Sequence, residues 1–598
     1  MKKTAILFYI FCVFLIYGCN DNIFAPDRLY FADEEGRVFV TNRSGNELLL
    51  LNPDLKSIKK KITFDAPVAD IKKTGDDRIW VVCEGSNGKL YELDADKLSI
   101  ISQTELGYNP SAVLYNPRSN SLWSTQRFNN SVWEIDPATK EVLSKIEVGR
   151  EPVDMITFAS DSFLLIANNL PEMSSLDFPV TAQLSVVDVS SKQMTKRIML
   201  PNGSTDVKAI TMSSDRSFAY VTHILARYQL PTNQVDRGWM CTNALSIIDL
   251  NNKELFNTVL LDTPQKGSAN PWGVTVSPDD KYIIVAASGV DELICIDRNA
   301  LHEKLAKAKD GIRVSPSSKR WEDIPDDAGF LYGVSKYIIT EGKGPRTVIA
   351  SKDYAYTTNY FTGELVKIDL KTEDKTIINL NRKALASTPV GKGNMYFYDA
   401  TIGFQGWQSC TSCHPNDARS DGLNWDLLND GMGNPKNTKT LVLSHETPPS
   451  MITGIRKDAE TAVRSGLKHI LFAEGSEEIS TAMDVYLKSL IPVPSPYLIN
   501  GELSETAQRG KTSFDNHCAS CHSGSNYTDM KQYNVNWATG KDKEIKMDVP
   551  TLREVWRTAP YLYDGRAYTM REMLEIHGPN VSLSDKELDD LAEYVLSL

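Results

Sequence analysis

The sequence lacks an excess of positive charge, and it lacks a second long apolar run. Lysine and arginine total 65 against 77 aspartate and glutamate residues, which gives a formal net charge of -12. Nucleic acids and anionic membrane surfaces would repel such a chain, and no DNA-binding motif is found, so no nucleic-acid partner is expected. The 598 residues are too many for one domain, and about three or four domains are expected.

The amino terminus carries an export signal. Residues 1–3 form a short positive region, residues 5–18 form an unbroken apolar run, and Cys19 follows in "LIYGC". The run is too short for a stable membrane span and is typical of a secretory signal. Its end resembles a bacterial lipoprotein signal, which implies a lipid on Cys19 and an anchor in a bacterial membrane, with the outer membrane favoured and the protein facing the periplasm or the cell surface. The alternative is an ordinary signal peptide with an incidental cysteine.

A repeated pattern fills residues 28–385, in which a strand, a polar turn and a strand ending in an acid recur. Two of the copies are "IWVVCEGSNGKLYELDA" (79–95) and "LWSTQRFNNSVWEIDP" (122–137), and the first copies begin 41 to 43 residues apart. One such unit cannot bury both its faces alone, so about seven copies predict an all-β propeller of about seven blades. The "VTN" and "IDL" phrases resemble YVTN-type propeller blades. Another kind of solenoid is the alternative.

Helical spacing replaces the strand pattern from about residue 386. Residues 476–490 and 584–598 each carry an apolar stripe, and the second stretch begins with a capping box of Ser584 and Glu587. The Pro-rich segment 491–501 separates the two stretches. After a signal peptide (1–18), a tether (19–27) and the propeller (28–385), we therefore expect two mainly α-helical domains, 386–500 and 501–598.

The two helical domains are related to each other. A shift of 108 residues superimposes "CTSCH" (410–414) on "CASCH" (518–522), and a shift of 111 pairs Gly454 with Gly565. At the carboxyl end of each domain the shift is again 108. An ordered set of matches of this kind predicts a tandem duplication.

Each pentapeptide is a C-x-x-C-H motif. A redox dithiol is expected at the start of a helix in a βαβ unit, which is not visible here, and structural zinc gives no reason for a histidine after the second cysteine. Haem c gives that reason, because two thioethers hold the porphyrin edge and the adjacent histidine binds the iron. The sequence therefore predicts two cytochrome c-type domains with two covalently attached haem c groups, and zinc or dithiol sites are the alternatives. The attachment residues are Cys410, Cys413 and His414 in the first motif and Cys518, Cys521 and His522 in the second.

The remaining cysteines look structural. Cys12 is removed with the signal, and Cys83, Cys241 and Cys295 lie in strand-like surroundings. We expect them to be small buried thiols rather than one disulfide with an orphan.

The duplication also pairs two histidines at the carboxyl side of each motif. His577 lies 55 residues after His522, and His469 lies 55 residues after His414. His577 is therefore predicted as the distal ligand of the second iron, and His469 as either the distal ligand of the first iron or an acid/base group beside an open haem. Further acid/base candidates are His445 and Glu446 in "LSHETPPSM".

Longer segments resemble the bacterial dihaem cytochrome c peroxidases and MauG, the enzyme that matures methylamine dehydrogenase. They are "VPTLREVWRTAPYLYDGRAYTMREMLEIHG" (549–578), "CASCHSGSNYTDM" (518–530) and "CTSCHPNDARSDGLNWDLLNDG" (410–431), and the resemblance covers about 390–598. It implies a peroxide-reactive first haem and an electron-transferring second haem whose ligand position falls on His577. It also implies a calcium ion between the domains, for which the Asp and Asn residues of 416–430 are candidates.

This sequence departs from the family pattern at two places. "MITGIR" (451–456) replaces the segment with the tryptophan that links the two haems in the family, and the distal glutamate has no clear match. The inter-haem bridge and the acid/base group therefore have to be found elsewhere.

Together, these features predict an exported dihaem c-type oxidoreductase that passes electrons from the C-terminal haem to a peroxide-reactive N-terminal haem. The expected partners are a redox protein or small electron donor, hydrogen peroxide, and a membrane through the lipid anchor. One alternative is a non-catalytic electron-transfer lipoprotein with two bis-His haems and the propeller as a docking or ligand-binding platform. Another is a surface binding protein whose haems only sense redox state.

Overall fold

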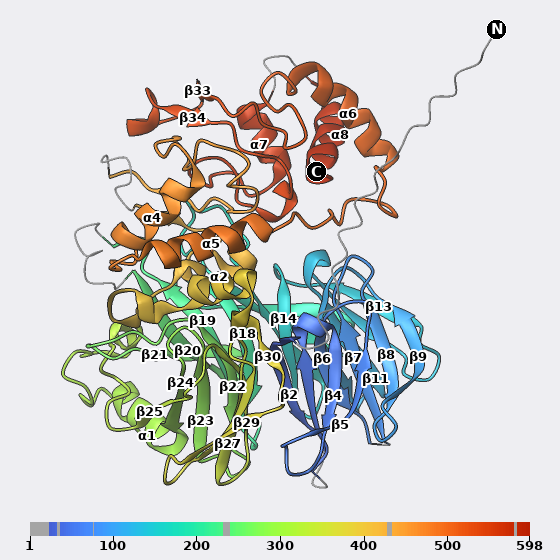
Figure 1. Ribbon diagram of the computed structural model, residues 1–598, viewed down its shortest axis with the longest axis vertical. Helices are drawn as coiled ribbons and strands as arrows, with labels where there is room; N and C mark the ends of the chain where they lie inside the picture. The colour runs from blue at the N-terminus through green and yellow to red at the C-terminus, as the bar shows by residue number, and fades with distance from the viewer. Residues whose placement is uncertain (1–22, 33–35, 76, 231–239, 427–432, 579–582) are drawn as a thin grey trace.

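A computed structural model describes residues 23–32, 36–75, 77–230, 240–426, 433–578 and 583–598. The chain forms a β-propeller, and a mainly helical part lies against one of the propeller's ends (Figure 1). Cys19 lies outside the described residues. No helix within them is both long and apolar enough to cross a membrane.

Seven four-stranded antiparallel sheets make up the propeller, as the repeat predicts. Each sheet uses four consecutive strands, and the first strands of successive sheets lie side by side, with β26 closing the ring against β2. The sheets are β2–β5 (Pro26–Phe31, Val38–Asn42, Glu47–Leu51, Ile58–Thr63), β6–β9 (Val68–Lys73, Arg78–Cys83, Lys89–Asp94, Ser99–Glu105), β10–β13 (Pro110–Asn116, Ser121–Gln126, Ser131–Ile135, Val142–Glu147), β14–β17 (Pro152–Phe158, Phe163–Asn168, Gln183–Asp188, Gln193–Met199), β18–β21 (Ser204–Met212, Phe218–Ala226, Cys241–Asp249, Glu254–Leu260), β22–β25 (Pro271–Val276, Tyr282–Ala287, Glu292–Asp297, Ser335–Ile339) and β26–β29 (Pro345–Ala350, Tyr354–Asn359, Glu364–Asp369, Lys375–Asn379).

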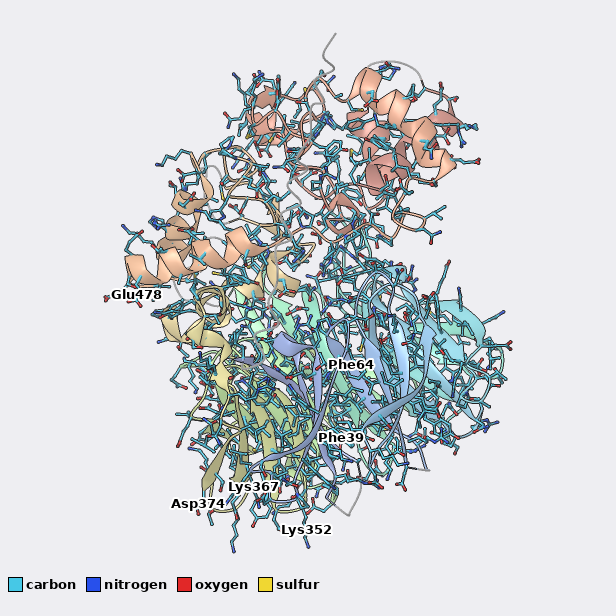
Figure 2. The ribbon with its side chains drawn as sticks, turned by 45° about the vertical axis from the view of Figure 1, so that its right-hand side comes forward. Phe39, Phe64, Lys352, Lys367, Asp374 and Glu478 are labelled. Atoms are coloured by element: carbon cyan, nitrogen blue, oxygen red, sulfur yellow. The ribbon has the colours of Figure 1, made fainter. Side chains whose placement is uncertain are left out.

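Burial along the strands explains why the sheets stack around an axis. The second and third strands of the first blade are buried over their whole length, whereas its fourth strand is mostly exposed. Strands covered on both faces need a neighbouring sheet on each side. Phe39 and Phe64 fill the space between the first two blades, and Lys352, Lys367 and Asp374 lie at the propeller end far from the helices (Figure 2).

The helical part contains two units built in the same way. In the first unit α2 packs on α5, and in the second α6 packs on α8. A Cβ added to Gly393 of α2 would collide with the Ala482 carbonyl, and one added to Gly510 of α6 would collide with the Asp590 carbonyl, so both helix pairs depend on glycine for their close approach. The helices are α2 (Pro389–Tyr398), α3 (Pro415–Ala418, a single irregular turn), α4 (Ala459–His469), α5 (Glu477–Ser489), α6 (Glu505–His517), α7 (Met570–His577) and α8 (Asp585–Leu596), while α1 (Arg298–Lys309) belongs to the propeller.

Short strand pairs complete the fold. β31 (Asn424–Trp425) pairs with β32 (Lys436–Asn437), and β33 (Gln532–Asn534) pairs with β34 (Lys546–Asp548). At the start of the propeller β1 (Ile23–Phe24) pairs in parallel with β30 (Lys383–Ala384), which leads into α2.

Buried polar contacts fix the helical part on the propeller. The Arg150 guanidinium donates to the carbonyls of Ala559 (2.8 Å) and Arg557 (3.0 Å). Asn270 donates to the Tyr398 carbonyl (3.1 Å) and the Ser409 hydroxyl (2.9 Å) and belongs to the loop before β22. Because these groups are buried and paired across the boundary, propeller and haem units form one body.

Candidate haem sites

The first C-x-x-C-H motif lies on a short helical turn against the propeller. Ser409 and Ser412 cap this turn reciprocally, and the Ser412 hydroxyl donates to Asn270 Oδ1 (3.0 Å). Cys410, Cys413 and His414 all line one cavity. Burial lowers the pKa of His414 to about 4, so its ring is neutral near pH 7 and can bind a metal. Two thiols and a neutral imidazole in one cavity are the donor set that haem c attachment needs.

The wall of this cavity is mainly apolar and hydroxyl-bearing. Helix α4 contributes small residues to it, among them Ala462 and Gly466, and the segment before α4 contributes Ser450, Met451 and Thr453. Charged groups are few. They are Asp426, Lys436, Lys439 and Arg456.

Helix α4 presents a glycine where the equivalent helix of the second unit presents a histidine. Asp458 caps α4 by accepting from Thr461 N (2.8 Å), and Thr569 caps α7 by accepting from Glu572 N (3.2 Å). Counted from these caps, Gly466 and His577 occupy the same position. A Cβ added at Gly466 would meet no atom within 4 Å, so the space beside this residue is open.

The segment before each helix supports this equivalence. The bridges Ser450–Arg456 and Tyr561–Ala567 occur at the same shift of 111 residues. Helix α4 has 11 residues and α7 has 8, so the three additional residues of the first unit lie inside the helix.

His469 is therefore placed differently from the sequence expectation. Three residues turn a helix by about 300° and advance it by roughly 4.5 Å, so the alignment of His469 with His577 does not hold in space. His469 is exposed at the carboxyl end of α4 and does not line the cavity. The structure does not bring it to His414.

The other two acid/base candidates also lie away from the cavity wall. His445 Nε2 is hydrogen-bonded to Asp484 Oδ1 (3.0 Å), and Arg464 donates to the other oxygen of Asp484 (2.8 Å). Glu446 is exposed and accepts from Asn526 Nδ2 (3.3 Å). Their contacts connect the first unit to itself and to the second unit, which is a structural role.

In the second unit two histidines face each other. His522 Nδ1 donates to the Tyr527 carbonyl (3.0 Å), which leaves Nε2 to bind a metal. The ring centroids of His522 and His577 are 6.4 Å apart and the ring planes are nearly perpendicular. A first-row metal binds an imidazole nitrogen at about 2.0–2.1 Å, so two histidines on opposite sides of one iron have ring centroids roughly 6 Å apart. The pair fits the two axial positions of one haem.

Trp537 holds the orientation of His577. Its indole Nε1–H donates to His577 Nδ1 (2.9 Å), and its ring stacks on Tyr563 with the centroids 5.7 Å apart. The sequence gave no reason to single out Trp537, because it lies in a loop far from both motifs.

The calcium candidates do not assemble in the part of the chain that the structure describes. Asp421 accepts from Leu423 N (3.0 Å) and Trp425 Nε1 (2.8 Å), and Asn416 is bonded to Asn169 (2.6 Å). No group of three His, Cys, Asp or Glu side chains suited to a metal is found there. Residues 427–432 lie outside the described residues.

Two further residues of the sites were missed from sequence. Thr551 lines the first cavity although it belongs to the second unit. Cys241, in the propeller, has its sulfur 4.0 Å from that of Cys413. A contact between distant segments of this kind leaves no local signal, although Thr551 does match Thr440, another lining residue, at the shift of 111.

Comparisons with known proteins agree with this geometry. The cytochrome c family model matches residues 507–598, so the second unit is a cytochrome c domain, which carries covalently bound haem c. The chain is 26% identical over 269 residues to hydrazine synthase subunit gamma of Kuenenia stuttgartiensis, covering 34% of this chain and 76% of that protein. It is 27% identical over 242 residues to cytochrome c551 peroxidase of Nitrosomonas europaea, covering 31% of this chain and 71% of the relative.

One solved structure has a similar fold. A chain of Kuenenia stuttgartiensis hydrazine synthase superimposes with a TM-score of 0.52 at 18% identity, covering 59% of this chain and 97% of the other. At this identity the likeness shows the fold alone. The matched sequences are those of haem proteins, and the chain described here is related to haem c oxidoreductases.

Proposed function

We propose that this chain is an exported, lipid-anchored dihaem c oxidoreductase of the cytochrome c peroxidase type. In this proposal the second unit passes electrons to the first, and the first unit reduces hydrogen peroxide. Each peroxide takes two electrons and two protons and leaves as two water molecules, and the electrons come from a redox protein or small donor.

Gly466 is the observation that carries the proposal. It occupies the position from which His577 reaches the second iron, and it has no side chain with which to do so. A haem held by Cys410, Cys413 and His414 would keep its sixth position open and could bind and activate a small oxygen ligand there. The alternative of two bis-His haems needs a second histidine in the first cavity, and the described lining contains only His414.

Two polar groups of the cavity are available to a small polar substrate. Ser450 Oγ and Gln408 Oε1 are buried, line the cavity and have no hydrogen-bond partner within the described residues. A buried polar group without a partner is unfavourable, so it gains when a ligand supplies one. The Ser450 hydroxyl can donate to a peroxide oxygen, and Gln408 Oε1 can accept a peroxide proton.

A connection of hydrogen bonds joins the second unit to the first cavity. His522 donates to the carbonyl of Tyr527 (3.0 Å), and the adjacent carbonyl, that of Asn526, accepts from Thr551 Oγ1 (2.7 Å). Thr551 lines the first cavity. We assign the passage of electrons between the units to this connection, in place of the tryptophan that residues 451–456 lack.

The ferric protein and a Gly466→His variant test the proposal together. The wild type should show one high-spin haem whose spectrum changes on addition of peroxide or cyanide, and it should oxidise a reduced donor with peroxide. Gly466→His should be fully low-spin and inert to both ligands. Gly466→Ala is the matched control and should keep the open-site spectrum, because a methyl group has room there and cannot bind iron. Two low-spin haems in the wild type, unreactive to peroxide, would leave the electron-carrier alternative in its place.

The membrane anchor is tested separately. Wild-type protein expressed in a bacterium should fractionate with membranes and incorporate labelled fatty acid, while a Cys19→Ala variant should lose the label. A soluble, unlabelled wild type would indicate an ordinary cleaved signal.

A further inference from the structure

A propeller cysteine touches the first haem motif. Cys241 opens β20, the third strand of the fifth blade, and is fully buried. Its Sγ lies 4.0 Å from Sγ of Cys413. Around the pair lies an apolar cluster from both parts of the chain, which includes Met240 and Trp425.

The contact sets Cys241 apart from the other propeller cysteines. Cys83 and Cys295 are also buried in strands, but they lie inside apolar clusters of the blades that contain no second sulfur. A disulfide has its sulfurs about 2.05 Å apart, so rotation of the two side chains has to close roughly 2 Å for a bond to form. Bonds of this kind persist in the oxidising compartments to which exported chains are delivered.

We propose that Cys241 and Cys413 form a disulfide in the chain before its first haem is attached, so that this bond competes with haem attachment. The inference rests on the proposed role of Cys413 as a haem attachment residue. While Cys413 sulfur is bonded to Cys241, it cannot add to a haem vinyl group, and the fifth blade is cross-linked to the first haem unit.

The chemistry is ordinary thiol–disulfide exchange. Cys413 lines the cavity and is therefore accessible from it, whereas Cys241 is not. The Cys413 thiolate attacks a disulfide oxidant, either a thiol oxidase or oxidised glutathione, and one oxidant thiol leaves. The Cys241 thiolate then attacks the Cys413 sulfur of the mixed disulfide and the second oxidant thiol leaves. Two protein thiols lose two protons and two electrons, and the oxidant is reduced to two thiols.

Peptide mapping of the full chain tests the bond. The protein is produced in a host without haem-attachment enzymes, exposed to oxidised glutathione, alkylated, and digested with trypsin without reductant. One tryptic peptide contains both Cys410 and Cys413, so a Cys410→Ser variant is used to assign the partner. A Cys241–Cys413 peptide pair is expected in this variant, also when Cys295→Ser is added, and it should vanish with Cys241→Ser. Separately alkylated Cys241 and Cys413 in a chain with a native circular dichroism spectrum would overturn the proposal.

Haem counting provides the second measurement and does not require the apo chain to fold. In a host with haem-attachment enzymes but limiting reductant, Cys241→Ser should carry more haem per chain than the wild type, and excess reductant should abolish the difference. Equal loading under limiting reductant would overturn the competition. A chain that loads only one haem under every condition would instead count against the dihaem proposal and would leave the peptide result standing.

Discussion

The two haem units share one framework and differ at the point where chemistry is decided. Each unit packs its first helix on its last through a glycine, and each carries a capped helix in front of its distal side. In the second unit this helix ends on His577, facing His522. In the first unit the same position is Gly466, and three additional residues move the next histidine, His469, to the surface. A duplicated unit can therefore change its iron coordination by lengthening one helix while its packing stays the same.

The largest effect is expected from making the second unit resemble the first. His577→Ala should convert the second haem from low-spin to high-spin and let it bind cyanide, because its only facing histidine is removed. His469→Ala is the control and should leave both haems unchanged. Electron paramagnetic resonance of the ferric proteins measures both. A changed first haem in His469→Ala would contradict the placement of this histidine at the surface.

The next effect tests whether the two units form one body. Arg419 of the first unit donates through two nitrogens to Glu554 of the second (3.0 and 2.9 Å), and both side chains are almost completely buried. Arg419→Ala leaves the carboxylate of Glu554 without its main partner, so the unfolding free energy should fall by about 3–5 kcal/mol.

Denaturant titration of the holoprotein measures this change. The exposed pair of Lys307 and Glu303 on α1 provides a control, because Lys307→Ala should cost less than about 1 kcal/mol. A similarly small change in Arg419→Ala would mean that the units are held together in another way.

A smaller effect tests the shared framework. Gly393→Ala and Gly510→Ala each push a methyl group into a carbonyl of the opposing helix, so each should destabilise the protein by about 1–3 kcal/mol. Gly466→Ala is again the control, because its methyl group enters open space and should stabilise the helix by about 0.5–1 kcal/mol. Thermal unfolding distinguishes them. A tolerated substitution at only one of the two positions would show that the helix pairs are not equivalent.

The smallest effect concerns the connection between the units. Thr551→Val keeps the shape of the side chain but removes the hydrogen bond to the Asn526 carbonyl, so electron transfer between the haems should become severalfold slower. Thr551→Ser should restore most of the rate. Stopped-flow spectroscopy of the reduced protein mixed with peroxide measures both rates. Equal rates in wild type and Thr551→Val would show that electrons take another route.

Much of the fold could be predicted from local pattern. The propeller follows from repeated strands of regular length, and α8 follows from its apolar stripe and the capping box of Ser584 and Glu587, which the structure contains. The facing pair of His522 and His577 was also predictable, because the ring position depends on a short helix adjoining a recognisable segment.

The first cavity could not be predicted in the same way. A comparison by residue count cannot tell whether three inserted residues lengthen a helix or a loop, and only the first case rotates His469 away from the iron side. Cys241 and Thr551 reach the first cavity from other parts of the chain, by contacts that depend on how the propeller and the second unit pack. His445 matched the chemistry of an acid/base group, but Asp484 and Arg464 engage it elsewhere.

The parallel pairing of β1 with β30 has a consequence for modular evolution and engineering. The chain enters the propeller at Ile23–Phe24 and leaves it beside the same two residues, at Lys383–Ala384. The seven blades therefore form a cassette whose ends are one strand spacing apart, about 4.8 Å. Such a cassette can be gained, exchanged or excised as a single piece of gene, with no linker needed to bridge the junction between the leading segment and the haem pair.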